Sequence, residues 1–254
     1  MKEYHYLLKP IILHRADRLR KAILCFIHCP NHSGALLPEL FLHPTELEYF
    51  QTLKHERRKK SYLLGRLAAK KAIGELAERK DLSSIHIQSG IFTQPIITSP
   101  VLQNVQVSIA HSEDYGVAIA FPEEHPMGID IEEVDEEKKD VLAEQLTESE
   151  KQMIKVTDGT DIEKMTVLWT VKEAISKILK TGLMTPLAVY ELSKIEKEGA
   201  HTYKSFYTNF GQYKAVSYVL HGFAYTLAYP KNTEIDFTAT QIDDWLERGT
   251  KSII

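Results

Sequence analysis

The sequence is poor in cysteine and has no long hydrophobic run. Its 254 residues include only two cysteines, Cys25 and Cys29, which are too few for a disulfide framework and have no zinc-finger spacing around them. The longest apolar runs are much shorter than the roughly 18 residues that a membrane-spanning helix needs. Residues 1–5 include a basic side chain but no apolar stretch typical of a secretory signal. The sequence therefore predicts a cytoplasmic protein that does not bind membranes.

The chain also lacks an excess of positive charge. Its 31 basic and 35 acidic residues give a formal net charge of −4. No overall field attracts nucleic acid, so a basic function would require a local patch, and we expect no nucleic-acid partner. With 43% hydrophobic residues the composition is that of a globular protein, and the length allows one large domain or two small ones, each with its own core.

Hydrophobic periodicity and capping residues predict helices and strands in a similar order in both parts of the chain. The elements expected in the first part are extended sequence to about residue 30, a helix from Pro44, a helix over 58–78 and a three-stranded meander over 105–132. Those expected in the second part are a short helix from Thr147, a longer helix from Thr160 to Gly182, strands near 189–196, 203–208 and 213–229, and a short helix over 239–248. We therefore expect a pseudo-duplicated α+β fold of two halves, residues 1–124 and 125–254, each with a helix packed on a small antiparallel sheet.

Two carboxylates lie at alternate positions of the expected strand Gly128-Ile129-Asp130-Ile131-Glu132. Side chains alternate between the faces of a strand, so Asp130 and Glu132 share a face and lie about 6.5–7 Å apart along the backbone. One or two carboxylates, together with phosphate oxygens and water, are the usual ligands of Mg²⁺. The pattern alone favours a strand with one solvated face, and a metal site is the alternative.

The longer helix of the second part has one apolar and one polar face. The apolar stripe, expected to face the core, consists of Leu168, Val171, Ile175, Ile178 and Leu179. The opposite side carries Trp169, Glu173, Lys177 and Lys180. Glu173 and Lys177 form an i,i+4 pair that is ordinary on a solvated face, but a tryptophan there normally needs a partner to cover it. If this face lines a cleft instead, Glu173 can join the strand carboxylates at a metal while the lysines meet phosphate oxygens.

A histidine and a basic helix are two further candidates. His111 lies where an expected strand runs into a turn, a place from which an imidazole can donate to a phosphate or transfer a proton, although such a histidine is more often structural or exposed. Lys59, Arg66 and Lys70 fall within about 40° of one another around their helix. They can bind a terminal phosphate together, and a solvated basic face is the alternative.

Together these segments resemble the 4′-phosphopantetheinyl transferase superfamily. Its signature strand, Gly-Ile-Asp-Ile-Glu, and signature helix, Trp-x-x-Lys-Glu-x-x-x-Lys, are matched by Gly128–Glu132 and Trp169–Lys177. Its Ser-His-Ser block, its basic N-terminal helix and its Gly/Lys-Pro element are matched by Ala110-His111-Ser112, Arg57–Arg66 and Thr93-Gln94-Pro95. The length and the two similar halves further resemble the surfactin-synthetase-activating type, a monomer with its active site between the halves.

The resemblance implies a reaction and a set of site residues. Coenzyme A donates its 4′-phosphopantetheine arm to a serine of an apo carrier protein, in a peptide, polyketide or fatty-acid synthase, and 3′,5′-adenosine bisphosphate is released. Mg²⁺, with Mn²⁺ as a possible substitute, would bridge the diphosphate and the implied ligands Asp130, Glu132 and Glu173. The implied catalytic residues are Glu173 as general base, Lys177 and His111. The residues implied to contact coenzyme A are Arg58, Lys59, Arg66, His111, Lys172 and Lys177.

Two departures from the family pattern predict weaker coenzyme A binding rather than inactivity. Ala110 stands where the family often has a serine, and Gln94 stands where a lysine is common. Two other functions remain as alternatives: a degenerate homologue that binds coenzyme A or a carrier protein without transfer, and an unrelated Mg²⁺-dependent nucleotide phosphohydrolase. The phosphohydrolase lacks support, because the sequence contains no Gly-x-x-x-x-Gly-Lys-Ser/Thr loop.

Overall fold

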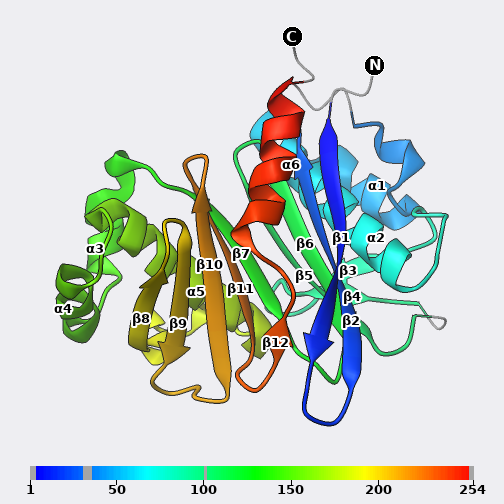
Figure 1. Cartoon of the computed structure of the whole chain (residues 1–254). Helices are drawn as coiled ribbons and strands as arrows, with labels where there is room; N and C mark the ends of the chain where they lie inside the picture. Colours follow the sequence, from blue (N-terminus) through cyan, green and yellow to red (C-terminus); the bar gives the residue numbers. More distant parts are fainter. Residues whose placement is uncertain (1–3, 31–35, 100–101, 252–254) are drawn as a thin grey trace. The chain divides into compact units, whose positions relative to one another are not determined.

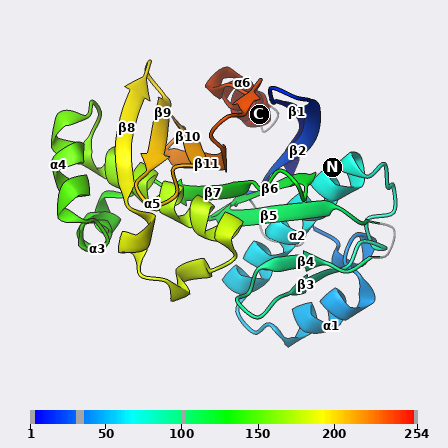
Figure 2. The ribbon, with the colours of Figure 1, turned by 90° about the horizontal axis from the view of Figure 1, so that it is seen from below.

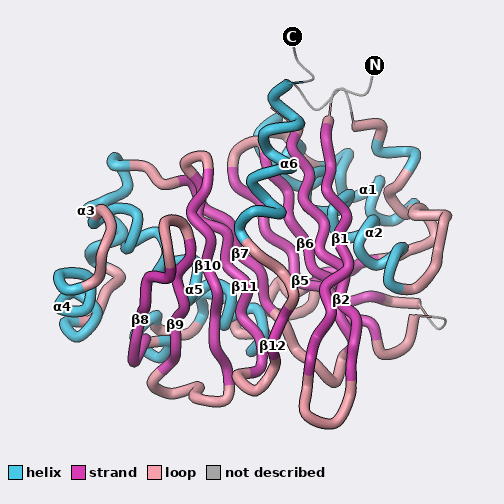
Figure 3. The backbone as a smooth tube through the Cα atoms, in the orientation of Figure 1, coloured by secondary structure: helices cyan, strands magenta, loops and turns pink. Residues whose placement is uncertain are grey.

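Two five-stranded antiparallel sheets, each packed against one long helix, form the framework of the structure (Figure 1, Figure 3). The computed structural model describes residues 4–30, 36–99 and 102–251. The chain divides into a first unit, Met1–Pro126 with Glu234–Asp236 and Lys251–Ile254, and a second unit, Met127–Thr233 with Phe237–Thr250. This architecture confirms the predicted α+β fold with two sheet–helix halves.

The sheet of the first unit has the strand order β12-β1-β2-β6-β5, and helix α2 packs on β2, β5 and β6 (Figure 2). Its strands are β1 (His5–His14), β2 (Leu19–His28), β5 (Val105–Ser112), β6 (Tyr115–Pro122) and β12 (Glu234–Ile235), and a separate hairpin consists of β3 (Ile87–Ser89) and β4 (Pro95–Ile97). Its helices are α1 (Pro44–Thr52), α2 (Glu56–Leu76) and the 3₁₀ helix η2 (Pro38–Leu40). Aliphatic side chains of α2 and β2, such as Leu64 and Ile23, form its core.

The sheet of the second unit has the strand order β7-β11-β10-β9-β8, and helix α5 packs on β7, β10 and β11. Its strands are β7 (Gly128–Glu133), β8 (Leu192–Glu198), β9 (Thr202–Tyr207), β10 (Tyr213–Leu220) and β11 (Phe223–Pro230). Its helices are α3 (Lys139–Glu144), α4 (Glu148–Val156), α5 (Asp161–Leu179) and α6 (Ala239–Lys251), with 3₁₀ helices η3 (Glu136–Lys138), η4 (Gly182–Met184) and η5 (Leu187–Tyr190). As the periodicity predicts, Leu168, Val171 and Ile175 of α5 are fully buried. In the part of the chain that the structure describes, no helix is long and apolar enough to span a membrane.

The two units share the order and register of three strands, β2-β6-β5 in the first and β7-β11-β10 in the second. In the first unit β5 and β6 form a hairpin, and β2, the strand before the helices, pairs with β6. In the second unit β10 and β11 form a hairpin, and β7, the strand before the helices, pairs with β11. Cys25 of β2 lies opposite Ala118, the fourth residue of β6, and Asp130 of β7 lies opposite Thr226, the fourth residue of β11. Cys25 therefore holds in the first unit the position that Asp130 holds in the second.

The predicted meander over 105–132 is wrong in its third strand. β5 and β6 form a hairpin, as expected, but β7 pairs with β11 in the other sheet. Pro122 ends β6 and Pro126 lies in the connection to β7, and neither has the N–H group needed to continue a ladder. An alternating pattern identifies a strand and its buried face, but it does not identify the strand's partner.

Each long helix carries a buried lysine that is paired with a glutamate of the preceding helix. Lys70 Nζ lies 2.6 Å from Glu46 Oε2 in the first unit, and Lys172 Nζ lies 2.6 Å from Glu150 Oε2 in the second. None of these four side chains is more than 3% exposed. Since an isolated charge is very costly to bury, each partner depends on the other.

Both glutamates also accept backbone hydrogen bonds from equivalent donors in the two units, and Glu46 has in addition Nε of Arg66 at 3.4 Å from its Oε1. The donors are the N–H group of the helix N-cap and that of the first residue in the strand after the long helix: His43 and Ile87 for Glu46, and Thr147 and Leu192 for Glu150. One carboxylate thus joins a helix start, a long helix and a strand. This repeated arrangement is the clearest sign of duplication in the fold.

Candidate active site

Two acidic side chains of β7 lie on the sheet face that α5 covers. Asp130 is 6% exposed, and its Oδ1 accepts a hydrogen bond from Lys177 Nζ of α5 at 2.7 Å. Glu132 follows two residues later on the same face and is half-buried, with one oxygen 3.6 Å from Lys138 Nζ. The solvated strand face that the pattern alone favours is therefore wrong for Asp130, because α5 packs over it.

Glu173 of α5 completes a group of three carboxylates that act on one another electrostatically. Burial raises the pKa of Asp130 to about 6; Lys177 opposes this shift and the charge of Glu173 adds to it. Burial also raises the pKa of Glu132 and of Glu173, and the charges of Asp130 and Glu132, respectively, add to these two shifts. Each carboxylate thus makes ionisation of another more costly, and a bound cation would relieve the repulsion.

One carboxylate oxygen of this group is buried without a partner. Asp130 Oδ2 makes no hydrogen bond, a costly state for an oxygen that carries charge. Carboxylate oxygens are the preferred ligands of Mg²⁺, so the donor chemistry fits a hard divalent cation. Within residues 4–30, 36–99 and 102–251, however, no three His, Cys, Asp or Glu side chains are gathered closely enough to hold a metal ion. Ligation by Asp130, Glu132 and Glu173 together therefore stays a prediction.

Gly128 allows β7 and α5 to approach closely enough for these residues to meet. A Cβ atom at Gly128 would overlap the carbonyl oxygen of Ala174 and lie 3.2 Å from Cγ1 of Ile178. The carbonyl belongs to backbone, which cannot rotate away as a side chain can. Glu173 immediately precedes Ala174 in α5. The close approach that Gly128 permits therefore also brings Glu173 near the strand carboxylates.

The substitution Gly128→Ala is expected to destabilise the second unit and to lower activity. Forcing an extra methyl group into a packed contact costs about 1–3 kcal/mol and moves α5 away from β7. Urea unfolding measures the stability, and Gly211→Ala is the matched control, because a Cβ atom at Gly211 has nothing within 4 Å. Equal unfolding free energies for the two variants would show that the contact is not restrictive.

Of the two α5 lysines implied to hold phosphates, only Lys177 lies at the carboxylates. It contacts Asp130 and donates to the carbonyl oxygen of Ile129 at 2.8 Å. Lys172 points into the core, is 1% exposed, and donates to Glu150 and to the carbonyl oxygen of Gln145. The ammonium group of Lys172 thus has its hydrogen-bond partners within the second unit. The phosphate contact that the resemblance implies for Lys172 is therefore wrong, and its role is structural.

The implied phosphate-binding residues of the first unit lie on α2 and β5. Arg58 is exposed, and Lys59 is paired with a glutamate three residues earlier. The Arg66 guanidinium lies 5.1 Å from the centroid of the Tyr62 ring, and His111 is exposed near the end of β5. The expectation that these residues bind coenzyme A alongside the carboxylates of the second unit stays a prediction.

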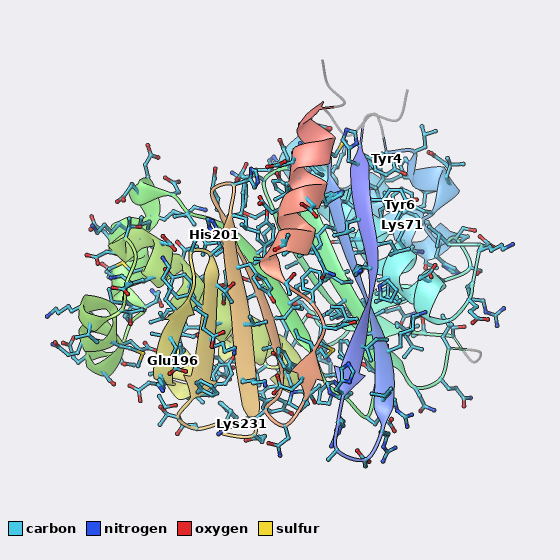
Figure 4. The ribbon with its side chains drawn as sticks, in the orientation of Figure 1. Tyr4, Tyr6, Lys71, Glu196, His201 and Lys231 are labelled. Carbon is cyan, nitrogen blue, oxygen red and sulfur yellow. The ribbon has the colours of Figure 1, made fainter. Side chains whose placement is uncertain are left out.

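The first unit has no carboxylate at the two positions equivalent to Asp130 and Glu173. Cys25 holds the first position, and burial raises its pKa to about 12. Lys71 holds the second position, because it comes directly after the buried Lys70 just as Glu173 comes directly after the buried Lys172. Nζ of Lys71 lies 3.9 Å from the centroid of the Tyr6 ring (Figure 4). The three-carboxylate group of the second unit therefore has no counterpart at these positions.

Comparison with known proteins gives a match to one family model and matches to shorter relatives. The family model of the 4′-phosphopantetheinyl transferase superfamily matches residues 126–230, which contain β7 to β11. A holo-[acyl-carrier-protein] synthase of Mycoplasma mycoides is 33% identical over 81 residues, which are 32% of this chain and 72% of that protein. The protein of the same name from Staphylococcus carnosus is 32% identical over 87 residues, covering 32% of this chain and 74% of its own. The segment matched by the family model, residues 126–230, contains Asp130, Glu132 and Glu173.

Proposed function

The chain belongs to the 4′-phosphopantetheinyl transferase superfamily, and we propose that it transfers the 4′-phosphopantetheine arm of coenzyme A to a serine of an apo carrier protein. The observation that carries this proposal is the unpartnered, buried Oδ2 of Asp130 within the group of three carboxylates. The presence of all three carboxylates within the residues matched by the family model supports transfer rather than binding alone.

Asp130, Glu132 and Glu173 would hold the divalent cation, Mg²⁺ or Mn²⁺. When bound, such a cation neutralises charge on the diphosphate, and charge neutralisation with positioning is the main source of catalysis in phosphoryl transfer. Lys177 brings a positive charge to the same place, since its Nζ already reaches Asp130. Its role in the proposal is to bind a phosphate oxygen of coenzyme A.

Glu173 is the proposed general base. The serine Oγ attacks the phosphorus that bears the pantetheine arm, the bond from that phosphorus to the leaving phosphate oxygen breaks, and 3′,5′-adenosine bisphosphate departs with the bond's electron pair. The serine proton passes to Glu173, directly or through water. Burial raises the pKa of Glu173 above its usual range, and a bound cation would lower that pKa again.

We further infer that the chain is of the two-half, monomeric type that activates carrier domains, such as the surfactin-synthetase-activating enzymes. The M. mycoides relative matches 81 residues of this chain, and this chain is more than twice as long as that relative. The first unit repeats the fold of the second without its acidic group, so its proposed role is to bind coenzyme A through Arg58, Lys59, Arg66 and His111. Natural carriers in this proposal are domains of peptide, polyketide or fatty-acid synthases.

Intact-mass spectrometry of an apo carrier protein tests the proposal. The carrier is incubated with this protein, coenzyme A and Mg²⁺, with EDTA in the control. A metal-dependent gain of one phosphopantetheine unit is the expected result. Binding of coenzyme A without a mass gain in several classes of carrier would show a degenerate homologue, and release of free phosphopantetheine would show a hydrolase.

Mg²⁺ is expected to raise the Tm more at pH 7.5 than at pH 5. With a folded-state pKa of about 6 against an ordinary value near 3.9, protonated Asp130 contributes stability that is fully present below the ordinary pKa and is lost as the pH rises through about 6. At pH 7.5 the ionised carboxylates repel one another and a cation stabilises them, whereas at pH 5 protons compete with it. Thermal unfolding with Mg²⁺ or EDTA measures this, and equal Mg²⁺ effects at both pH values would contradict it.

A further inference from the structure

Three buried hydroxyl groups form a hydrogen-bonded chain between the second sheet and α5. Ser217 Oγ of β10 lies 2.7 Å from Thr226 Oγ1 of β11, which lies 2.7 Å from Thr170 Oγ1 of α5. Thr170 in turn donates to the carbonyl oxygen of Val167 at 2.9 Å. The three hydroxyl-bearing residues are all 0% exposed.

The direction of this chain is fixed by its last acceptor. A carbonyl oxygen cannot donate, so the single proton of Thr170 goes to Val167 and its oxygen must accept from Thr226. The proton of Thr226 is then in use, so Thr226 accepts from Ser217. Every hydroxyl proton has one defined acceptor, and the chain has one low-energy arrangement.

The chain lies beside the carboxylate group. Thr226 is the register partner of Asp130 on the neighbouring strand, and residues paired in this way have Cβ atoms about 4.5–5.5 Å apart on one face. Thr170 precedes Glu173 by three residues, close to one helical turn. The bond between Thr226 and Thr170 therefore links the strand beside Asp130 to the helix turn that carries Glu173.

The side chains around the hydroxyl chain are mostly apolar, and the other hydrogen bonds between α5 and the sheet nearby come from Tyr207, whose hydroxyl donates to the carbonyl oxygen of Val171, and from Lys177, which donates to β7. Fully buried Val167, Val171 and Ala174 of α5 pack against Ala224 and Ala228 of β11. Contacts among small aliphatic side chains tolerate a slide or rotation of the helix by a fraction of an ångström, whereas a hydrogen bond loses strength steeply when its geometry changes. The hydroxyl chain thus specifies the position of α5 on the sheet more sharply than its apolar neighbours do.

We propose that Thr226 and Thr170 are positioning residues for the metal centre: their hydrogen bond sets the placement of Glu173 relative to Asp130. The inference rests on the proposed function, because it assigns this placement to cation binding and transfer. Neither threonine contacts a substrate in the proposal. They act through the two carboxylates that the structure places on the facing strand and helix.

Thr226→Val tests the proposal, because valine keeps the shape of threonine and removes the hydroxyl. Mn²⁺ alone is the probe, and electron paramagnetic resonance measures its affinity for the protein. The expected result is a loss of affinity of about tenfold, the lower end of the roughly 10- to 100-fold effect of residues that hydrogen-bond metal ligands directly, with a similar fall in kcat and little change in KM for the carrier. Thr226→Ser, which restores the hydroxyl, should recover both quantities.

Two further variants keep the test decisive. Thr170→Val breaks the same link from the helix side and should give the same loss, even if Thr226→Val proves too unstable to study. Thr166→Val is the matched control: Thr166 is buried on the same helix, but its hydroxyl donates to the carbonyl oxygen of Ile162 within that helix. Its expected Mn²⁺ affinity is that of the wild type.

Three results would overturn the inference: unchanged Mn²⁺ affinity in both link-breaking variants, an equal loss in Thr166→Val, or no Mn²⁺ binding by the wild type. Failure of the proposed function looks different. In that case the wild type binds Mn²⁺ but transfers nothing to any carrier, while the affinities of the variants still decide whether the hydroxyl link positions the carboxylates.

Discussion

The variant Asp130→Asn is expected to lose transfer activity while remaining at least as stable as the wild type. Asparagine keeps the volume of aspartate and an oxygen that Lys177 can donate to, but it removes the negative charge. Loss of charge stabilisation worth several kcal/mol corresponds to a fall in kcat/KM of roughly 10³-fold or more. Without a cation, the buried carboxylate of Asp130 is itself costly, as its raised pKa shows, so a neutral amide does not weaken the fold.

The measurement pairs the mass-based transfer assay with thermal unfolding in EDTA. Glu133→Gln is the control, because Glu133 is the next acidic residue of β7 but points to the opposite face from Glu132. It should transfer at the wild-type rate. Retained transfer in Asp130→Asn and in Glu173→Gln, with both variants folded, would remove the carboxylate group from the mechanism. A fall in activity that merely follows a fall in Tm would assign Asp130 to stability alone.

The second large effect is expected from Lys172→Met, which should destabilise the protein by about 3–5 kcal/mol. Methionine fills a similar volume but leaves the carboxylate of Glu150, which is fully buried, without its cation. Glu150 also holds the start of α4 and the first N–H group of β8, so a shift of this side chain loosens three elements at once. The free energy of unfolding in urea gives the magnitude.

The ion pair of Lys151 with Glu148 is a matched control for this effect. Its N–O distance of 2.7 Å is close to the 2.6 Å of the buried pair, but both of its side chains are well exposed. Lys151→Met should therefore cost no more than about 1 kcal/mol. The double variant Lys172→Met with Glu150→Gln should recover part of the loss, because no unpaired charge stays buried. A Lys172→Met variant as stable as Lys151→Met would mean that the pair does not carry the stability assigned to it.

Local patterns were sufficient for the helices and strands that carry the carboxylates. The apolar stripe of α5 predicts the burial of Leu168, Val171 and Ile175, and the alternation in β7 predicts the burial of Ile129 and Ile131 but not that of Asp130. The β3–β4 hairpin was not predicted, because strands of three residues are too short to show a period. The register that places Asp130 beside Thr226 could not be predicted either, because it pairs residues that are almost a hundred positions apart in the sequence.

Long-range partners explain where the reasoning about single side chains failed. Lys172 stands next to Glu173 in a polar motif, and its burial depends on Glu150, 22 residues earlier. The capping pattern at Thr147 correctly predicts Glu150 as an N-terminal helix residue, but no local signal shows that its carboxylate also accepts from α5 and β8. Thr170 and Thr226 have ordinary roles in their own elements, and only the packing of α5 on the sheet brings their hydroxyls together.

The short strand β12 changes what a break in the backbone would do. After the second sheet is complete, the chain returns to pair Ile235 with Leu13 of β1, and Asp236 accepts a hydrogen bond from the N–H group of Ile12 at 2.8 Å. This pairing lies within the first unit, so its sheet contains strands from both ends of the chain. A protease that cuts the connection between β6 and β7 would therefore leave two fragments that share the first sheet, with β1 in one fragment and β12 in the other.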